Sequence, residues 1–325
     1  MARRKRGRDV HGIIVVNKPI GLSSNQVLQK VKRIFNANKA GHTGALDPLA
    51  TGVLPICLGE ATKFSQVLLD ADKGYRTTAR LGEIRTTGDA EGDVIQTKAV
   101  PCFSDQDVVQ TLGQYLGPIE QVPPLFSALK LNGQPLYKLA RQGLSATEMA
   151  EIADKKRRTV TIHQLDLLRR DVISLDLNVR CSKGTYIRSL VEDIGNTLGC
   201  GAYVSFLHRT LSAPYDESHM YSLEELQDLG DKQNLGDKQD WSRLDSLLLP
   251  LETAIPDTWP CYSVSESDVA KLKQGQKIRI DPDFATGLSD IPPVQLRASE
   301  RDGSPCIAIG RLEGEFIYPS KVLNR

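Results

Sequence analysis

The sequence lacks the features that mark several large classes of protein. Its six cysteines form no C-x-x-C pair and no histidine cluster accompanies them, which argues against a zinc site. No apolar run is long enough to span a bilayer, and the short run 13–16 behind the basic N-terminus is not a secretion signal. We therefore expect a cytoplasmic protein with free thiols, no disulfide framework and no membrane partner.

The chain also lacks a large net charge, because 41 basic and 40 acidic residues give a net charge of only +1. No global attraction to nucleic acid follows from this balance. Basic residues are concentrated at 3–8 and at 155–158. Each cluster is either a solvated surface run or a phosphate-binding patch, and composition does not decide between them.

Motifs of metal, phosphate-loop and dinucleotide chemistry are absent: G-x-x-x-x-G-K-[ST], G-x-G-x-x-G after a strand, and H-E-x-x-H. A G-x-S-x-G elbow is missing too. The acidic segment 88–93 lacks the glycine and glutamate offsets of an EF-hand loop, so it is interpreted as a turn between strands. What remains is a site without metal or cofactor, built from a carboxylate and basic or aromatic groups.

Hydrophobic periodicity predicts an α+β fold in a chain of 325 residues, long enough for a large and a small domain. A short apolar run predicts a buried strand at 13–16, and alternating residues predict strands at 75–81 and 172–181; further strands are predicted at 160–170 and 202–210. Helical spacing predicts helices at 24–35, 106–117 and 187–198. These elements favour a mixed, mostly antiparallel sheet with flanking helices over residues 11–255, behind a basic arm of residues 1–10.

Beyond residue 256 the pattern changes to short strands between Gly, Pro and Asp turns, at 277–280, 294–298, 306–312 and 316–318. This pattern predicts a small separate β-barrel or sandwich over 256–325. Residues 229–240 contain a near-tandem six-residue repeat that begins Leu-Gly-Asp-Lys-Gln. Two copies are too few for a solenoid, so we interpret the repeat as a polar insertion or linker.

Segment 41–55 holds three glycines and two prolines, too many for a regular helix or a central strand. It predicts a shaped loop that presents Asp47, whose backbone is restrained by the following Pro48. Its neighbours are small or apolar and would remove water from the carboxylate. Taken alone, the Asp–Pro pair favours an Asx turn over a catalytic group.

Four other residues are candidates for the same site. Tyr75 opens a strand, and is either a core tyrosine or a flat ring facing a cleft. Tyr186 and Arg188 lie in the first turn of a helix, where arginine forms either a surface ion pair or a partner that keeps Asp47 ionised. His42 is a wedge that stacks between bases, a proton carrier or a hydrogen-bonding loop residue. The chemistry of its side chain does not decide among these three roles.

Four motifs together resemble the TruB family of tRNA pseudouridine synthases, in the order of that family over about residues 11 to 210. They are segments 17–24 (NKPIGLSS), 41–52 (GHTGALDPLATG), 123–130 (PPLFSALK) and 181–190 (CSKGTYIRSL). The resemblance implies a pseudouridine synthase fold for the catalytic domain. The strands beyond residue 256 are similar, more weakly, to the PUA-like domain of the family.

The resemblance implies an isomerase that converts the T-loop uridine of tRNA, at position 55, to pseudouridine without cofactor or metal. It implies that Asp47 is the catalytic carboxylate and that Arg188 pairs with it. Tyr75 matches the ring that stacks on the flipped uracil, and Tyr186 matches the second active-site tyrosine. Leu207 matches an apolar residue that lies against the base. His42 matches the histidine that stacks in the space left by the extruded nucleotide.

The partner implied by the resemblance is tRNA, bound by a monomer through its T arm and, at the C-terminal domain, its acceptor stem. Segment 122–158 would clasp the RNA. Phosphate contacts are then expected from the basic residues of this segment, Lys130, Lys138, Arg141, Arg157 and Arg158.

Two alternatives belong to other functional classes. A non-catalytic tRNA-binding or tRNA-folding chaperone on the same scaffold would not need Asp47. A glycoside hydrolase would need two cooperating carboxylates, and the motifs contain no second acid beside Asp47.

Overall fold

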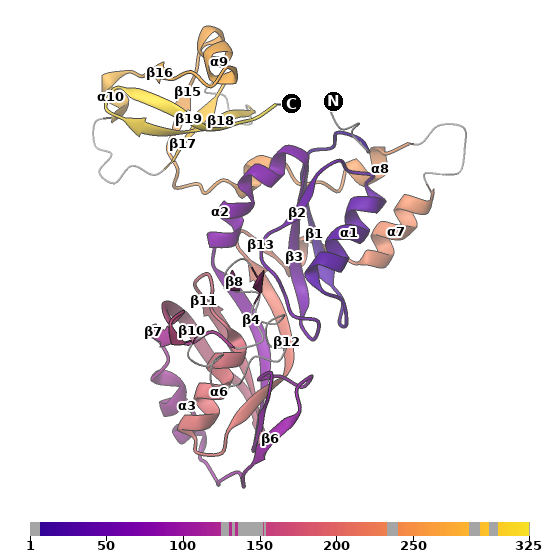
Figure 1. The fold of residues 1–325 in the computed structure, drawn as a ribbon, viewed down its shortest axis with the longest axis vertical. Coiled ribbons are helices and arrows are strands. Elements are labelled where there is room, and N and C mark those ends of the chain that lie inside the picture. The colour runs from indigo at the N-terminus through magenta and orange to yellow at the C-terminus, as the bar shows by residue number, and fades with distance from the viewer. Residues whose placement is uncertain are drawn as a thin grey trace.

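The computed structural model describes residues 7–124, 130–131, 134–135, 152, 154–232, 240–285, 293–298 and 305–324. A large mixed sheet runs through most of the molecule, and a smaller sheet formed by the last residues lies at one end (Figure 1). No helix within these ranges is both long and apolar enough to cross a membrane.

The large sheet has ten strands, eight of them in the order β14-β1-β3-β12-β4-β11-β10-β7. Neighbours are antiparallel except for the pairs β1–β14 and β3–β12, which are parallel. The strands on this path are β1 (Gly12–Lys18), β3 (Thr51–Leu58), β4 (Lys73–Leu81), β7 (Gly117–Gln121), β10 (Arg158–Asp171), β11 (Ser174–Cys181), β12 (Ala202–Ser212) and β14 (Met220–Tyr221). The short β2 (Ala40–His42) adds to β3, and β13 (Tyr215–Asp216) adds to β12.

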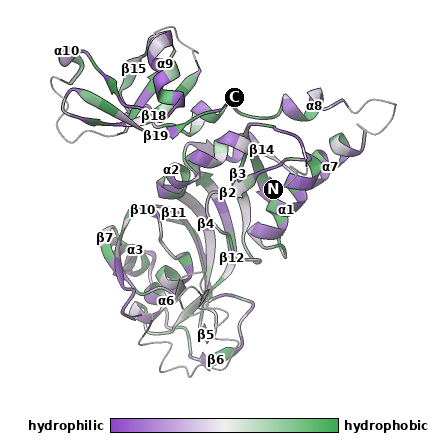
Figure 2. Ribbon diagram, turned by 45° about the horizontal axis from the view of Figure 1, so that its top comes forward, coloured by the Kyte–Doolittle hydropathy of each residue, from purple (hydrophilic) through white to green (hydrophobic). Residues whose placement is uncertain are grey.

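Amphipathic helices pack on this sheet because each buries one apolar stripe. Figure 1 shows α3 (Asp105–Gly113) and α6 (Ile187–Thr197) together on the part of the sheet formed by β4, β10 and β11. At the other end, α1 (Ser24–Ile34) begins with a capping box between Ser23 and Gln26 and packs against α7 (Leu223–Lys232). In Figure 2 hydrophobic residues are frequent along the central strands, whereas α1 carries both hydrophobic and hydrophilic stretches.

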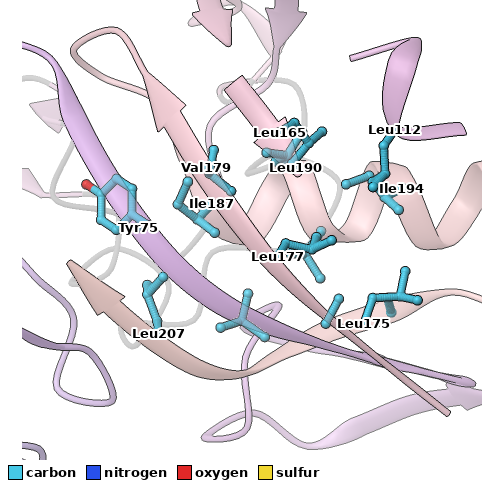
Figure 3. Packing of buried hydrophobic residues seen from close by; sticks show 14 of the residues in the cluster. Tyr75, Leu112, Leu165, Leu175, Leu177, Val179, Ile187, Leu190, Ile194 and Leu207 are labelled. Atoms are coloured by element: carbon cyan, nitrogen blue, oxygen red, sulfur yellow. The ribbon is translucent and has the colours of Figure 1, made fainter. Parts of the chain in front are cut away.

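The core under α6 positions the functional residues. Side chains of α6 such as Ile187, Leu190 and Ile194 interlock with those of β11 such as Leu175 and Leu177. Figure 3 shows Tyr75 and Leu207 at one end of this row of buried side chains, next to Val179 and Ile187. A close-packed core of this kind fixes the side chains at its edge.

Shorter elements connect these layers. They are η1 (Gly59–Phe64), α2 (Ser65–Asp70), the hairpin β5 (Glu83–Arg85) and β6 (Val94–Thr97), the hairpin β8 (Lys130–Leu131) and β9 (Gln134–Pro135), η2 (Glu217–His219), α8 (Ser242–Asp245) and η3 (Leu251–Ala254). The predicted turn 88–93 does lie between the two strands β5 and β6. The basic arm is partly structural, because Arg8 forms an ion pair with Asp245 and stacks 4.2 Å above the ring of Trp241.

The C-terminal residues form a five-stranded sheet in the order β15-β17-β18-β19-β16. Its elements are β15 (Cys261–Ser263), α9 (Glu266–Lys273), β16 (Ile278–Arg279), α10 (Pro282–Ala285), β17 (Val294–Arg297), β18 (Cys306–Glu313) and β19 (Phe316–Val322). The predicted strands are therefore confirmed. The unit is not fully separate, because Ile309 and Leu323 share a core with Phe64 and Leu68.

Two sequence-based predictions about individual elements are wrong. Within segment 41–55 only residues 43–50 form a loop, since residues 41–42 belong to β2 and residues 51–55 belong to β3. Pro55 lies in β3 although it has no N–H, and its carbonyl accepts the Thr43 N–H at 3.2 Å. The helix predicted to end at 117 ends at Gly113, and β7 begins at Gly117. The repeat at 229–240 begins inside α7, where Leu229 packs on a buried cluster. Residues 233–239 lie outside the described ranges, so the polar insertion or linker stays a prediction.

Candidate active site

The loop that carries Asp47 is fastened to the sheet by a buried lysine. The side chain of Lys18 has no exposed surface, and its ammonium donates to the carbonyl oxygens of Pro19 (2.9 Å), Pro48 (3.2 Å) and Ala50 (2.5 Å). Burial lowers the pKa of Lys18 to about 8, although the charge of Asp47 opposes the shift. Two of these bonds fix the backbone directly after Asp47, and the third ties it to the turn that follows β1.

The five residues predicted for the catalytic site other than His42 line one cavity of about 280 Å³: Asp47, Tyr75, Tyr186, Arg188 and Leu207. They come from the loop before β3, from β4, from the start of α6 and from β12, which are distant in sequence and meet at one edge of the buried core. The other lining residues are Gly44, Ala45, Leu46, Leu69, Lys73, Arg158, Gly184, Thr185, Ile187 and Arg209.

Arg188 joins two carboxylates. Its Nη2 lies 3.0 Å from Oδ2 of Asp47, and its Nη1 lies 3.6 Å from Oδ2 of Asp89. Nη1 also donates to the carbonyl of Thr87 at 2.8 Å. The side chains of Arg188 and Asp89 are 5% and 4% exposed, while 42% of the Asp47 side chain is exposed. The predicted Arg188–Asp47 pair is therefore confirmed as a contact, with a second, buried carboxylate behind it.

Arg188 lowers the pKa of Asp47, as predicted, but the net shift of this pKa is upward. Removal from bulk water raises the pKa of Asp47 above its usual value, and this effect is larger than the lowering by the charge of Arg188. The charge of Asp89 raises the pKa further, and that of Lys18 lowers it. The sequence identified the opposite charge but not the extent to which the folded chain excludes water around the carboxylate.

Tyr75 lies beside a buried arginine. It is 8% exposed on β4, directly across the strand pair from Arg209 on β12. The Tyr75 hydroxyl interacts with the guanidinium of Arg209, and burial raises the pKa of this hydroxyl to about 12 even though the charge of Arg209 lowers it. Tyr75 is therefore neutral near pH 7 and presents an uncharged ring to the cavity.

Tyr186 is the N-cap residue of α6, and its backbone is held by the buried side chain of Gln121. The Tyr186 N–H donates to Oε1 of Gln121 at 2.7 Å, and Nε2 of Gln121 donates to the Tyr186 carbonyl at 2.9 Å. The guanidinium of Arg158 lies 5.0 Å from the centre of the Tyr186 ring and donates to the carbonyl of Gly184. Arg158 therefore belongs to the wall of the cavity.

Other predicted residues lie elsewhere. His42 is in β2 and does not line the cavity; its Nδ1 is buried without a hydrogen-bond partner, and burial lowers its pKa. Arg157 is bound to Asp154 at 2.5 Å and lines a different cavity of about 640 Å³. Lys130 belongs to β8, whereas Lys138 and Arg141 lie outside the described residues.

Known proteins match almost the whole chain. Residues 32–187 match the TruB family pseudouridylate synthase (N terminal domain), and residues 188–256 match the tRNA pseudouridylate synthase B C-terminal domain. A protein of Aeromonas salmonicida (strain A449) named tRNA pseudouridine synthase B is 49% identical over 327 residues, which cover 100% of this chain and 98% of that protein. The chain belongs to the TruB family.

A second relative with the same name, from Shewanella sp. (strain W3-18-1), is 45% identical over 323 residues, covering 99% of this chain and 96% of that protein. Among solved structures the fold is similar to one described as "Crystal Structure of a Cbf5-Nop10-Gar1 Complex". The TM-score is 0.71 at 26% identity, over 96% of this chain and 84% of that chain. The pseudouridine synthase fold predicted from the TruB-like motifs is thereby confirmed.

Sequence reasoning missed four residues of this TruB-family site: Lys18, Asp89, Gln121 and Arg209. Asp89 was part of the segment interpreted only as a connecting turn, yet its Oδ1 accepts the Thr87 hydroxyl at 2.5 Å and its Oδ2 faces Arg188. Lys18 lies in the motif at 17–24, but that motif alone does not show that the Lys18 ammonium binds the Asp47 loop. Among the described residues, no three His, Cys, Asp or Glu side chains are grouped to hold a metal ion.

Proposed function

We propose that this protein is a tRNA pseudouridine synthase that isomerises the T-loop uridine at position 55, with Asp47 as the catalytic carboxylate. The observation that carries the proposal is the cavity that holds Asp47 against Arg188 beside the ring of Tyr75. Family membership supports the reaction class, since relatives covering nearly the whole chain are named tRNA pseudouridine synthase B.

The cavity suits one flipped nucleoside. Its volume, about 280 Å³, is near the lower end of the range for small-ligand sites. Tyr75, Leu207 and Ile187 give it apolar and aromatic walls, which a base extruded from a folded loop requires. Asp47 and Arg188 supply the charged groups beside these walls.

The reaction needs no external reagent. The C1′–N1 bond of uridine breaks, the uracil turns over inside the cavity, C5 bonds to C1′, and the proton on C5 leaves while N1 gains one. Asp47 is the carboxylate placed to act on the reacting nucleoside, and Arg188 stabilises its charge at 3.0 Å. The neutral Tyr75 ring supports the base as it turns.

Two observations favour this enzyme over the alternatives. A non-catalytic tRNA chaperone has no need for a carboxylate held against a 5% exposed arginine in a cavity. A glycoside hydrolase needs two carboxylates facing the substrate, but Asp89 does not line the cavity and its Oδ2 is directed at Arg188.

We further propose that tRNA binds across several parts of a monomeric, cytoplasmic protein. In this proposal residues 11–255 form the catalytic domain, with 122–158 as the RNA-clasping insertion, and residues 256–325 form a PUA-like domain on the acceptor stem. His42 fills the space of the extruded nucleotide. The basic residues assigned to the RNA backbone are Lys130, Lys138, Arg141, Arg157 and Arg158, of which Arg158 is close enough to the cavity to contact the target nucleotide.

The experiment that tests the proposal is tritium release from tRNA transcripts labelled with [5-³H]uridine. Two transcripts are compared, one with uridine at position 55 and one with cytidine there. We expect release from the first and none from the second. No release from the first transcript would refute the synthase activity, and equal release from both would refute the assigned position.

A further inference from the structure

Arg209 is the most deeply buried charged group of the cavity wall, with 1% of its surface exposed. It lies on β12, directly opposite Tyr75 on β4. No carboxylate of the described residues is within ion-pair distance of its guanidinium, unlike Arg188, which reaches two. Burying a cation without a carboxylate costs several kcal/mol, as a rough figure, unless neutral acceptors satisfy its N–H groups.

The acceptors of Arg209 belong to both sides of the cavity. Nε donates to the carbonyl of Val53 at 2.7 Å, and Nη2 donates to the carbonyl of Gly44 at 3.4 Å. Tyr75 lies directly opposite Arg209 in the strand pair, and its hydroxyl is the third group that interacts with this guanidinium. One guanidinium therefore connects the Asp47 loop, strand β3 and the ring that faces the cavity.

The backbone of Arg209 meets the same loop. Gly52 has a φ of +99°, and a Cβ there would lie 2.3 Å from the Arg209 carbonyl oxygen, so only glycine fits. Gly44 has a φ of +115°, and a Cβ there would lie 3.5 Å from Nη1 of Arg209. Gly44 of the Asp47 loop and Gly52 at the start of β3 are thus both positioned around this one residue.

The charge of Arg209 also acts on the groups around the loop. Burial is the larger cause, but the positive charge of Arg209 further lowers the pKa values of Lys73, His42 and Lys18. An apolar residue of similar size would fill the same space without this field. The positive charge and the forked geometry are therefore the properties that distinguish Arg209 from a packing residue.

We propose that Arg209 is a positioning residue that fixes the Tyr75 ring relative to the Asp47 loop and thereby holds the cavity in its reactive shape. This inference rests on the proposed function, in which both groups act on one flipped uridine. Arg209 acts through Tyr75 and the loop carbonyls. A displacement of about 1 Å in such a site reduces rates by about 100-fold.

The test compares Arg209→Met, Arg209→Lys and the control Arg76→Met in single-turnover tritium release and in tRNA binding. Arg76 neighbours Tyr75 on β4, but its side chain is 49% exposed. We expect Arg209→Met to reduce the rate constant by about 100-fold with tRNA affinity unchanged. Arg209→Lys should be about 10-fold slower than wild type, because one ammonium retains the charge but cannot reach all three acceptors. Arg76→Met should match wild type.

Coupling to Tyr75 separates positioning from general damage. In a Tyr75→Phe background, Arg209→Met should cause a clearly smaller further loss of rate, and the decreases in Tm of the two changes should not add. Wild-type rates in Arg209→Met, or in Arg209→Lys if Arg209→Met does not fold, would overturn the inference. Additive effects of the two changes would overturn it as well. If wild-type protein releases no tritium, the proposed function fails, and the Tm coupling alone decides the role of Arg209.

Discussion

The guanidinium of Arg188 lies 3.0 Å from the carboxylate of Asp47. Its other terminal nitrogen is directed at Asp89, which is buried and also accepts the Thr87 hydroxyl. Asp89 therefore fixes the arginine from behind, while Asp47 remains partly open to the cavity. This arrangement keeps one carboxylate available for the nucleoside and uses the other to hold its partner.

Replacing Asp89 with asparagine should slow the reaction while leaving tRNA binding intact. The variant removes the charge that holds Nη1 of Arg188, so the arginine loses its fixed position beside Asp47. We expect a decrease of about 10- to 100-fold in the single-turnover rate constant. The control is Asp93→Asn, an exposed acid in the same turn. Equal rates in wild type and Asp89→Asn would show that Arg188 needs no second carboxylate.

The pH dependence of the rate should report the raised pKa of Asp47. Activity that needs the ionised carboxylate is lost as pH falls, because the carboxylate becomes protonated. Since the pKa is raised, the midpoint of this loss should lie above the ordinary aspartate value of 3.8. Arg188 lowers this pKa, so Arg188→Gln should move the midpoint of its residual activity to higher pH. Single-turnover rates over the acid range measure both midpoints. A midpoint at 3.8, or one that is unchanged in Arg188→Gln, would contradict the electrostatic account.

Stability should depend on pH through Glu192 of α6. Burial raises its pKa from 4.5 to about 7. Between pH 4.5 and 7, therefore, Glu192 keeps its proton in the folded state and has lost it in the unfolded state. The stabilisation is present below about pH 4.5 and is lost as pH rises toward 7. The upper limit of this loss is on the order of 3 kcal/mol.

Urea unfolding of wild type and Glu192→Gln at about pH 5 and pH 8 checks this prediction. The free energy of unfolding of wild type should fall between the two pH values by more than that of Glu192→Gln, which has no group to titrate at this position. Identical changes in the two proteins would show that burial does not raise the pKa of Glu192. The exposed Glu224 of α7 provides a control, because Glu224→Gln should behave like wild type.

The sequence predicted the parts of the site that belong to contiguous motifs, and missed those created by the fold. Asp47, Tyr186 and Arg188 lie in segments that resemble TruB-family motifs, and the structure brings them to one cavity. Arg209 contacts Gly44 across 165 positions of the chain, through strand pairing that local patterns do not specify. The connection of Asp89 to Arg188 likewise crosses from the β5–β6 turn to α6.

Local rules also failed where tertiary contacts override them. Pro55 argued against a strand, yet it lies opposite Val15 in the pair of β1 and β3, because neighbouring residues supply the hydrogen bonds of the ladder. Arg188 lowers the pKa of Asp47, as expected, yet the net shift of this pKa is upward. The desolvation that reverses this direction depends on the packing of several distant elements, which the sequence pattern does not contain.

The central claim is that the carboxylate of Asp47 performs the isomerisation. The most direct measurement is single-turnover tritium release from [5-³H]uridine-labelled tRNA by wild type and Asp47→Asn, with tRNA affinity measured for both. Asparagine keeps the size of the side chain and removes the charge. We predict that Asp47→Asn binds tRNA as wild type does and releases no tritium; release at the wild-type rate would contradict the assignment.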